Sequence, residues 1–199
     1  MGQATDSLSL LGWLTKLRRI TAEAKVPYAA DYVEDFLEST ENDKIAIGVH
    51  HHTVRDGLKM ALEARGIYPL TYSGQDTPFA KDRILQRFEK EDNQRVLIIS
   101  ELAGGFGINL QFCANTLILE RQWNYADEEQ FVSRFHRNGQ KKAVVADFVL
   151  CENTIDSYFH DMVLEKKAIF GETIGSWDFT SDYTSLKELA ERVTAGRIR

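Results

Sequence analysis

The sequence predicts an α/β fold, a parallel sheet with helices on both faces, preceded by a helical extension. Three observations carry this prediction. Short β-rich apolar runs alternate with segments of helical periodicity, which is the order that builds a covered parallel sheet. The run VLIIS at 96–100 is the most hydrophobic of the expected strands, as a buried parallel strand requires. Residues 1–40 contain no such run and instead repeat their apolar side chains at helical spacing.

The elements follow in order along the chain. A helical extension is expected over 1–40, with Leu10, Leu14 and Leu17 on one stripe. The later elements are a strand at 45–49, a helix at 53–64, a strand at 68–72, a helix opened by Thr77 and Pro78, a central strand at 96–100, strands at 116–120 and 143–150, and a long helix from Thr154. SLKELAERV near the end adds a surface helix. The expected domains are a helical extension or inter-lobe segment at 1–40, an α/β lobe at 41–172 and a helical tail at 173–199.

Composition indicates a globular intracellular protein. The chain has 199 residues, 43% hydrophobic and 27% charged, with three prolines, enough for one sizeable core. No apolar run reaches membrane-spanning length and the amino terminus is not a secretory signal. Cys113 and Cys151 have apolar neighbours and are expected to be buried free thiols. We therefore expect no membrane partner, and a location in the nucleus of a eukaryote or the cytoplasm of a prokaryote.

The charge balance favours a local basic groove over a wholly basic surface. The formal net charge is −6, which disfavours nucleic-acid binding by the whole surface but not by a patch. Two clusters of cations stand out, Lys16, Arg18 and Arg19 in the first and Arg134, Arg137, Lys141 and Lys142 in the second.

The segment EQFVSRFHRNGQ carries the most chemical information. If it is helical, Gln130, Arg134 and Arg137 recur at i, i+4 and i+7 on one face, while two phenylalanines four residues apart anchor the helix. Arginine makes forked, permanently charged contacts with phosphate, so this stripe suits a triphosphate. The alternative is an ordinary amphipathic helix with a solvated basic face.

A glycine-rich loop, SELAGGFGINL, follows the strand at 96–100, where ligands gather in open α/β sheets. Gly104, Gly105 and Gly107 would let the backbone approach a phosphate or sugar, and Asn109 adds an amide. Without further support, such a glycine-rich loop is more often a tight turn than a ligand-binding site. It is no dinucleotide fingerprint, and GxxxxGK[ST] occurs nowhere in the chain. The chain therefore cannot cradle a triphosphate alone in the usual way.

Two polar clusters have the residue types of metal sites, but their positions in the sequence favour other roles. Three consecutive histidines, 50–52, cannot all reach one ion from a strand end, so a contact of His51 and Thr53 with a phosphate backbone is the better hypothesis. Asp127, Glu128 and Glu129 open a helix and are interpreted as capping and surface charge. No metal site and no nucleophilic catalytic set are predicted.

Together these segments resemble the second RecA-like lobe of a superfamily 2 helicase motor of the SWI/SNF type. The matching pieces are AIGVHHHTVRDGL as motif IV, TYSGQD as the Ser-Gly segment, LIISELAGGFGINLQFCANTLILERQWN as motif V and QFVSRFHRNGQ as motif VI. The Trp123-Asn124 pair before motif VI adds specificity. LTKLRRI resembles the helical segment between the lobes, and NTIDSYFHDMVLEKKAIFGETI resembles the segment after the core in the annealing-helicase branch. The resemblance covers nearly the whole chain.

The resemblance implies roles for particular residues. Arg134 and Arg137 would be the motif VI arginines, with Arg137 favoured as the finger on the γ-phosphate, and Gln130 would help to position the nucleotide. Other nucleotide contacts would come from Gly105, Gly107 and Asn109. Contacts with DNA would come from His51, Thr53, Ser73, Gly74, Ser100, Gly104 and Trp123.

The sequence departs from the family pattern at four positions. Tyr125 replaces the usual proline after Trp-Asn, Glu120 replaces a common aspartate, and Phe106 and Ile108 are variant apolar choices. None of these removes a motif VI side chain, so they bear on the branch more than on the activity.

The leading hypothesis is half of an ATP-driven translocase on double-stranded DNA. An N-terminal RecA-like lobe of the same full-length protein would supply the P-loop lysine and the acidic box, and would hold most of the ATP and Mg²⁺. The isolated chain is expected to be monomeric and almost inactive. The main alternative is a non-catalytic DNA-binding or regulatory α/β module. A dinucleotide- or nucleotide-sugar-binding domain is a weaker third hypothesis, because no GxGxxG follows the first strand.

Overall fold

The computed structural model describes residues 2–100, 108–122 and 125–172. The chain divides into two compact units, each described here by itself. One comprises residues 1–22, 123–125 and 150–199, and the other comprises residues 23–122 and 126–149. Within the described ranges no helix has both the length and the apolar character needed to cross a membrane.

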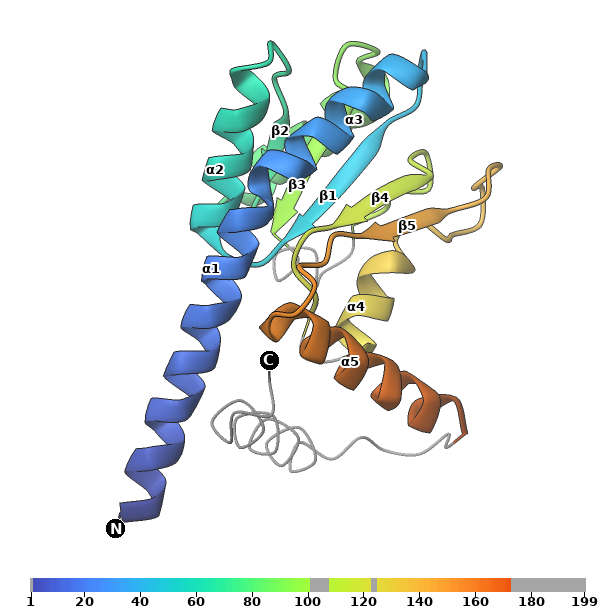
Figure 1. Ribbon diagram of the computed structural model, residues 1–199. Helices are drawn as coiled ribbons and strands as arrows, with labels where there is room; N and C mark the ends of the chain where they lie inside the picture. The colour runs from blue at the N-terminus through green and yellow to red at the C-terminus, as the bar shows by residue number, and fades with distance from the viewer. Residues whose placement is uncertain (1, 101–107, 123–124, 173–199) are drawn as a thin grey trace. The chain divides into compact units, whose positions relative to one another are not determined.

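The larger unit is built on a sheet of five parallel strands in the order β2-β3-β1-β4-β5 (Figure 1). The strands are β1 (Ile45–Val49), β2 (Leu70–Tyr72), β3 (Val96–Ser100), β4 (Asn115–Ile118) and β5 (Val145–Phe148). The predicted fold class is confirmed. The prediction that the 96–100 run is the central strand is wrong, because β1 pairs with β3 on one side and with β4 on the other. Both β1 and β3 are buried along their whole length, so composition alone could not rank them.

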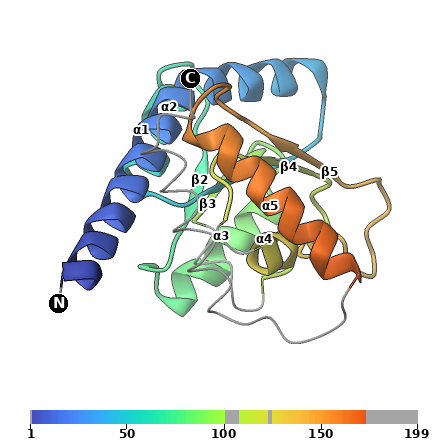
Figure 2. The same ribbon diagram turned by 60° about the horizontal axis from the view of Figure 1, so that its bottom comes forward.

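Five helices accompany the strands in the described residues. They are α1 (Gly2–Ser39), α2 (His52–Glu63), α3 (Pro78–Lys90), α4 (Tyr125–Val132) and α5 (Ile155–Glu172). α3 and α4 cover one face of the sheet, where Phe88 and Phe131 share a core with Leu97 and Ile99. α2 packs on β1 and β3 through its buried stripe, and Figures 1 and 2 show it with α1 on the opposite face. Helices thus cover both faces, as the alternating sequence pattern predicts.

The boundaries of the predicted strands and helices match the structure or differ by one or two residues, apart from the motif VI segment treated below. α3 begins as predicted, since the Thr77 side chain accepts a hydrogen bond from the Ala80 N–H and Pro78 occupies the first turn. β2 is shorter than the predicted 68–72, and β4 ends two residues before Glu120. The predicted helix SLKELAERV lies outside the described residues.

The second half of α1 is tied to β5 and to the residue that follows it. Lys25, almost fully buried, donates from Nζ to the carbonyl oxygen of Val149 at 2.9 Å. The Tyr32 hydroxyl donates to Asp147 Oδ2 at 2.5 Å. Partial burial, followed by the neighbouring Asp147 carboxylate, raises the pKa of Tyr32 to about 12. These contacts fix one edge of the sheet under a helix.

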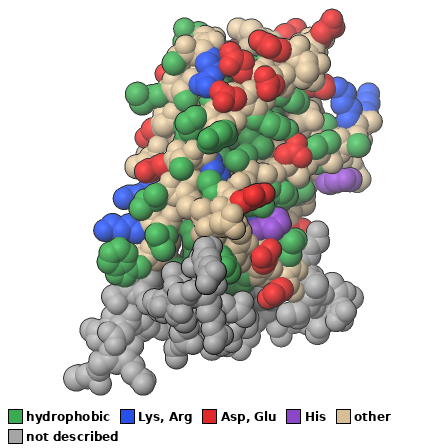
Figure 3. All heavy atoms as spheres, viewed as in Figure 1, with side chains coloured by type: hydrophobic (Ala, Val, Ile, Leu, Met, Phe, Trp, Pro, Cys, Tyr) green, Lys and Arg blue, Asp and Glu red, His purple; other side chains and the backbone are tan. Residues whose placement is uncertain are grey.

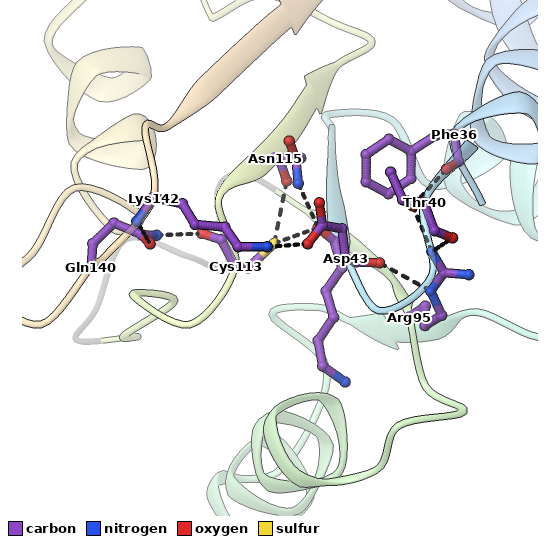
Figure 4. Close-up of polar contacts among 9 residues, drawn as sticks. Phe36, Thr40, Asp43, Arg95, Cys113, Asn115, Gln140 and Lys142 are labelled. Carbon is purple, nitrogen blue, oxygen red and sulfur yellow. Dashed lines mark hydrogen bonds and ion pairs between the residues drawn. The ribbon is translucent and has the colours of Figure 1, made fainter. Parts of the chain in front are cut away.

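The amino-terminal edge of the sheet is closed by a polar network (Figure 4). Arg95, just before β3, donates to the carbonyl oxygens of Leu37, Thr40 and Asp43 at 3.1, 2.8 and 3.0 Å. It thereby satisfies groups at the carboxyl end of α1 that have no partner within the helix. The Asp43 carboxylate also pairs with Lys142, which precedes β5. The polar network at this edge therefore has a structural role, since it joins the end of α1 to the segments before β3 and β5.

Cys113 is a buried free thiol, as predicted, whereas the free thiol of Cys151 is only partly buried. Cys113 Sγ lies 3.2 Å from the carbonyl oxygen of Lys44 and 3.3 Å from that of Asn115. Burial raises the pKa of Cys113 to about 12, so the thiol is protonated and inert at neutral pH.

The smaller unit has a separate apolar core. Its buried members are Leu14 from α1 and Ile155, Phe159 and Val163 from α5. The Arg18 guanidinium carbon lies 4.5 Å from the centre of the Phe159 ring, and Arg18 is only 6% exposed. Arg18 was predicted to belong to a basic surface cluster with Lys16 and Arg19. That prediction is wrong for Arg18, because its side chain is packed into this core.

Candidate nucleotide and DNA interface

Polar side chains gather at the carboxyl edge of the sheet, where parallel strands all end. His50 and His51 follow β1, Ser73 follows β2, Ser100 ends β3 and Glu120 lies two residues beyond β4. The register sets Val49 opposite Ser100, so these ends are level with one another. The edge opposite the Arg95 network therefore carries these polar side chains, and it is the candidate functional edge.

Glu120 organises the turn after β1. Its Oε2 accepts hydrogen bonds from the backbone N–H groups of His50 and His51 at 2.8 and 2.9 Å, and its Oε1 lies 2.5 Å from His51 Nδ1. Burial by itself would raise the pKa of Glu120. The hydrogen bonds from the His51 ring and the two N–H groups outweigh burial, so the pKa lies below its ordinary value. The carboxylate stays ionised and holds His51 in place.

Replacing Glu120 by Gln is expected to lower the melting temperature at neutral pH, because the charge-assisted bonds weaken. A depressed folded-state pKa gives stability that is present above the ordinary glutamate pKa and lost as pH falls through the folded-state value. The gap between wild type and Glu120→Gln should therefore close below about pH 4. Calorimetry between neutral and acid pH measures it. Glu89→Gln on the exposed side of α3 is the control, and a gap that does not change with pH would contradict the assignment.

Two predicted DNA-binding residues lie in this turn. His51 is half-buried against Glu120 and directly precedes α2, whereas Thr53 in the first turn of α2 is exposed. The backbone N–H groups of His50 and His51 are already engaged by Glu120, so an incoming phosphate would meet Thr53 and the next N–H groups of α2 instead.

The Ser-Gly segment forms a tight turn after β2. The Ser73 hydroxyl and backbone N–H both donate to Asp76 Oδ2, at 3.0 and 2.6 Å, and Ser73 is only 4% exposed. Gly74 is exposed, and a Cβ built on it would meet nothing within 4 Å. The turn therefore offers the Gly74 backbone to a ligand while the Ser73 side chain holds its shape.

The motif VI residues do not share a helical stripe, so that prediction is wrong. α4 ends at Val132, and turns follow it. Ser133 Oγ donates to the Gln130 carbonyl oxygen at 2.7 Å, and the N–H groups of Arg134 and Phe135 turn back three residues, at 3.1 and 3.0 Å. Such three-residue bonds tighten a helix end and stop its propagation.

The side chains of motif VI consequently divide between the interior and the surface. Phe131 and Phe135 are buried with their ring centres 5.4 Å apart, so the predicted aromatic anchor is confirmed. Arg134 is 5% exposed, whereas Gln130 and Arg137 are exposed. Arg134 is held at its backbone, where its carbonyl oxygen accepts from the Leu110 N–H at 3.0 Å.

The electrostatic surroundings of Arg134 are set by burial and by two nearby side chains. Burial lowers the pKa of Arg134, the positive charge of Arg137 lowers it further, and Tyr72 at the end of β2 acts in the opposite direction. Tyr72 ends β2 directly before the Ser73 turn, so Arg134 lies within electrostatic reach of that strand end.

Sequence reasoning missed a buried ion pair beneath this site. Arg121 donates from Nε to Glu128 Oε2 at 2.9 Å and also pairs with Oε1, and both side chains are only 5% exposed. The Arg121 guanidinium carbon stacks 4.6 Å from the centre of the Phe148 ring. Glu128 was predicted to be capping or surface charge, and its burial in this pair corrects that prediction. The pair joins the end of β4 to α4.

The remaining predicted residues divide into two groups. Ser100 is buried at the end of β3, and Asn109 is exposed with its Oδ1 accepting from the Gln111 N–H at 3.3 Å. The predicted residues Gly104, Gly105, Gly107 and Trp123 lie outside the described residues.

The described residues of this edge offer an anion two kinds of group, arginine side chains and exposed backbone turns. In the described part of the chain, no three His, Cys, Asp or Glu side chains converge as metal ligands. Of the two motif VI arginines, the exposed Arg137 is the one that phosphate groups can reach from solvent. Hydrolysis would need a nucleotide-binding body that brings Mg²⁺ and positions the attacking water.

Residues 28–139 match the model of the helicase conserved C-terminal domain. The chain is 28% identical over 183 residues to an uncharacterised ATP-dependent helicase of Mycoplasma pneumoniae, covering 86% of this chain and 18% of that protein. It is 26% identical over 196 residues to the Drosophila melanogaster SWI/SNF-related matrix-associated actin-dependent regulator of chromatin subfamily A-like protein 1, covering 96% of this chain and 25% of the relative. The chain thus spans a quarter or less of these relatives.

Solved structures show the same fold. The Sulfolobus solfataricus SWI2/SNF2 ATPase C-terminal domain superposes with a TM-score of 0.70 at 19% identity, over 95% of this chain and 82% of the other. The core of that ATPase in complex with double-stranded DNA gives 0.73 at 21% identity, over 95% of this chain and 42% of the other. The chain belongs to the helicase conserved C-terminal domain family, and its fold is that of the SWI2/SNF2 ATPase C-terminal domain.

Proposed function

We propose that this chain is the second lobe of an ATP-driven motor on double-stranded DNA and that Arg137 is its arginine finger. The observation that carries the proposal is the exposed Arg137 side chain of a helicase C-terminal domain, on a turn whose backbone is held by hydrogen bonds from Leu110 to Arg134 and from Gln140 to Arg137. An exposed guanidinium on a held backbone suits the negative charge that spreads over a transferring phosphoryl group. Gln130, exposed one turn before Arg134, would position the nucleotide.

The partner that this function requires is a first RecA-like lobe of the same full-length protein. That lobe would bring the P-loop lysine and the carboxylates that hold Mg²⁺, because the present sequence contains no GxxxxGK[ST]. ATP would close the two lobes so that Arg137 reaches the γ-phosphate, and hydrolysis would let them open again.

DNA would lie across the carboxyl edge of the sheet. Gly74 and Thr53 are exposed there, next to turns that are held rigid by Asp76 and Glu120. Figure 3 shows acidic side chains spread over the visible face, with the Lys and Arg side chains of that face in separate groups. The solved relative in complex with double-stranded DNA supports this class of ligand. Contacts with the phosphate backbone would grip DNA without reading its sequence.

The lobe requirement is tested by measuring ATP hydrolysis in three samples, the isolated chain, a first lobe alone and the two joined. We expect the two separate lobes to hydrolyse almost no ATP, and the joined lobes to be stimulated about tenfold or more by double-stranded DNA. Raising the salt concentration should abolish the stimulation, because phosphate contacts release counterions. Hydrolysis by the isolated chain at the joined rate, or a joined rate that ignores DNA, would argue for another function.

The alternative of a non-catalytic DNA-binding or regulatory module gives a different result in the same assay. Such a module would bind duplex DNA in fluorescence anisotropy, yet the joined lobes would hydrolyse ATP no faster with DNA than without it.

A further inference from the structure

The turn that carries Arg137 is closed by one side chain, that of Gln140. Gln140 Nε2 donates to the carbonyl oxygens of Cys113 and Phe135 at 3.1 and 3.4 Å, and its Oε1 accepts from the Lys142 N–H at 3.0 Å. Its own backbone N–H donates to the Arg137 carbonyl oxygen at 3.0 Å. Figure 4 shows the Gln140 side chain directed at Cys113 and Lys142. Both ends of the amide are therefore used.

The carbonyl groups that Gln140 holds belong to rigid parts of the lobe. Cys113 is 1% exposed, and its thiol is bonded to the backbone of Lys44 and Asn115 at the start of β1 and β4. Phe135 is fully buried against the Phe131 ring. Gln140 thus connects the Arg137 turn to the sheet on one side and to the aromatic core on the other.

The same turn is fixed at two further points. At its start the Arg134 carbonyl oxygen accepts from the Leu110 N–H at 3.0 Å. Before its end Gly139 adopts a φ of +111°, and a Cβ there would lie 3.1 Å from the Gln111 Oε1 atom. Only glycine fits both the backbone angle and this close approach. The backbone from 134 to 140 is therefore defined by tertiary contacts, since it has no helix to define it.

We propose that Gln140 is a positioning residue for Arg137, an inference that rests on the proposed arginine-finger function. An arginine finger stabilises a transition state only if its guanidinium is placed before the reaction begins. Because the Arg137 side chain is exposed, its position is set mainly by the backbone of the turn. The hydrogen bonds of Gln140 hold that backbone in place. Loss of these bonds would leave the charge present but misplaced, and a displacement of about 1 Å costs about 100-fold in rate.

The hydrogen-bond partners at position 140 require an amide side chain. Two N–H groups must point at two carbonyl oxygens while the other end accepts a backbone N–H, and a glutamine side chain supplies both kinds of group. A glutamate keeps the length and the accepting end but turns an oxygen toward the carbonyl groups of Cys113 and Phe135, where it repels them. Gln140→Glu is therefore a near-isosteric change that opens the turn.

The test is ATP hydrolysis by the complete two-lobed ATPase carrying Gln140→Glu. We expect kcat to fall about 10- to 100-fold, with KM for ATP and affinity for DNA within about twofold of wild type. Gln86→Glu, the same change at an exposed position of α3, is the matched control and should retain the wild-type kcat. If Gln140→Glu does not fold, Gln140→Met removes the donors without adding charge and carries the same expectation.

A double-mutant cycle separates positioning from general damage. If Gln140 acts through Arg137, adding Gln140→Glu to Arg137→Ala lowers kcat no further, whereas a merely structural defect lowers it by the same factor in both backgrounds. A Gln140→Glu enzyme with the kcat of the control overturns the inference while leaving the arginine finger intact. If Arg137→Ala itself keeps the wild-type rate, the proposed function fails and this inference fails with it.

Discussion

Arg137→Ala is expected to reduce DNA-stimulated ATP hydrolysis by the complete two-lobed ATPase about 1000-fold. The loss should appear in kcat with KM for ATP little changed, because the guanidinium acts on charge that develops only in the transition state. Arg137 is exposed and makes its hydrogen bond within the turn through its backbone, so the fold should survive the change. Steady-state kinetics at saturating DNA measure the effect.

Two variants sharpen this result. Arg87→Ala removes a partly exposed arginine of α3 that pairs with Glu91, the residue directly after that helix, and it should keep the wild-type rate. Arg137→Lys restores a positive charge but not the forked donor geometry, so it should recover only a small part of the rate. Retention of the full rate by Arg137→Ala would remove the arginine finger from this lobe.

Glu128→Ala is expected to lower the free energy of unfolding by about 3 to 5 kcal/mol. The change deprives the buried Arg121 guanidinium of a carboxylate that it contacts at 2.9 Å, in a place where both side chains are only 5% exposed. For a chain of this size the melting temperature should fall by about 10 °C. Thermal unfolding of the isolated chain followed by circular dichroism measures the shift.

Glu129→Ala provides the control, because it removes an exposed carboxylate from the next position of the same helix and should change the melting temperature by less than about 2 °C. Replacing both partners, Arg121→Met with Glu128→Leu, should recover much of the loss, since an apolar pair leaves no charge to desolvate. Equal melting temperatures for the two single alanine variants would show that the buried pair adds no stability.

Local patterns in the sequence were sufficient to predict most of the sheet and its helices. IAIGV corresponds residue for residue to β1, because a strand buried on both faces must be apolar along its length. Thr77 and Pro78 marked the start of α3 because capping depends on adjacent residues. The carboxyl-edge position of His51, Ser73 and Ser100 followed from parallel topology.

The parts that depend on distant contacts could not be predicted. Spacing alone placed Arg134 and Arg137 on a helix, but α4 ends at Val132 and the N–H groups of Arg134 and Phe135 form three-residue turns after it. Glu128 lies in α4, whereas Arg121 lies in the segment between β4 and α4, so helical spacing does not relate them. The order of the strands was equally hidden, since β1 and β3 are alike in sequence and burial.

The central place of β1 has a consequence for synthesis of the protein on the ribosome. The first strand to emerge needs β3 on one side and β4 on the other, and neither is available before residues 96–100 and 115–118 have been made. Until then both edges of the IAIGV strand have unpaired backbone N–H and C=O groups. This segment is therefore prone to aggregate by pairing with strands of other nascent chains. Slow translation before Ile118 should therefore lower the yield of soluble protein, and a chaperone that shields this strand should restore it.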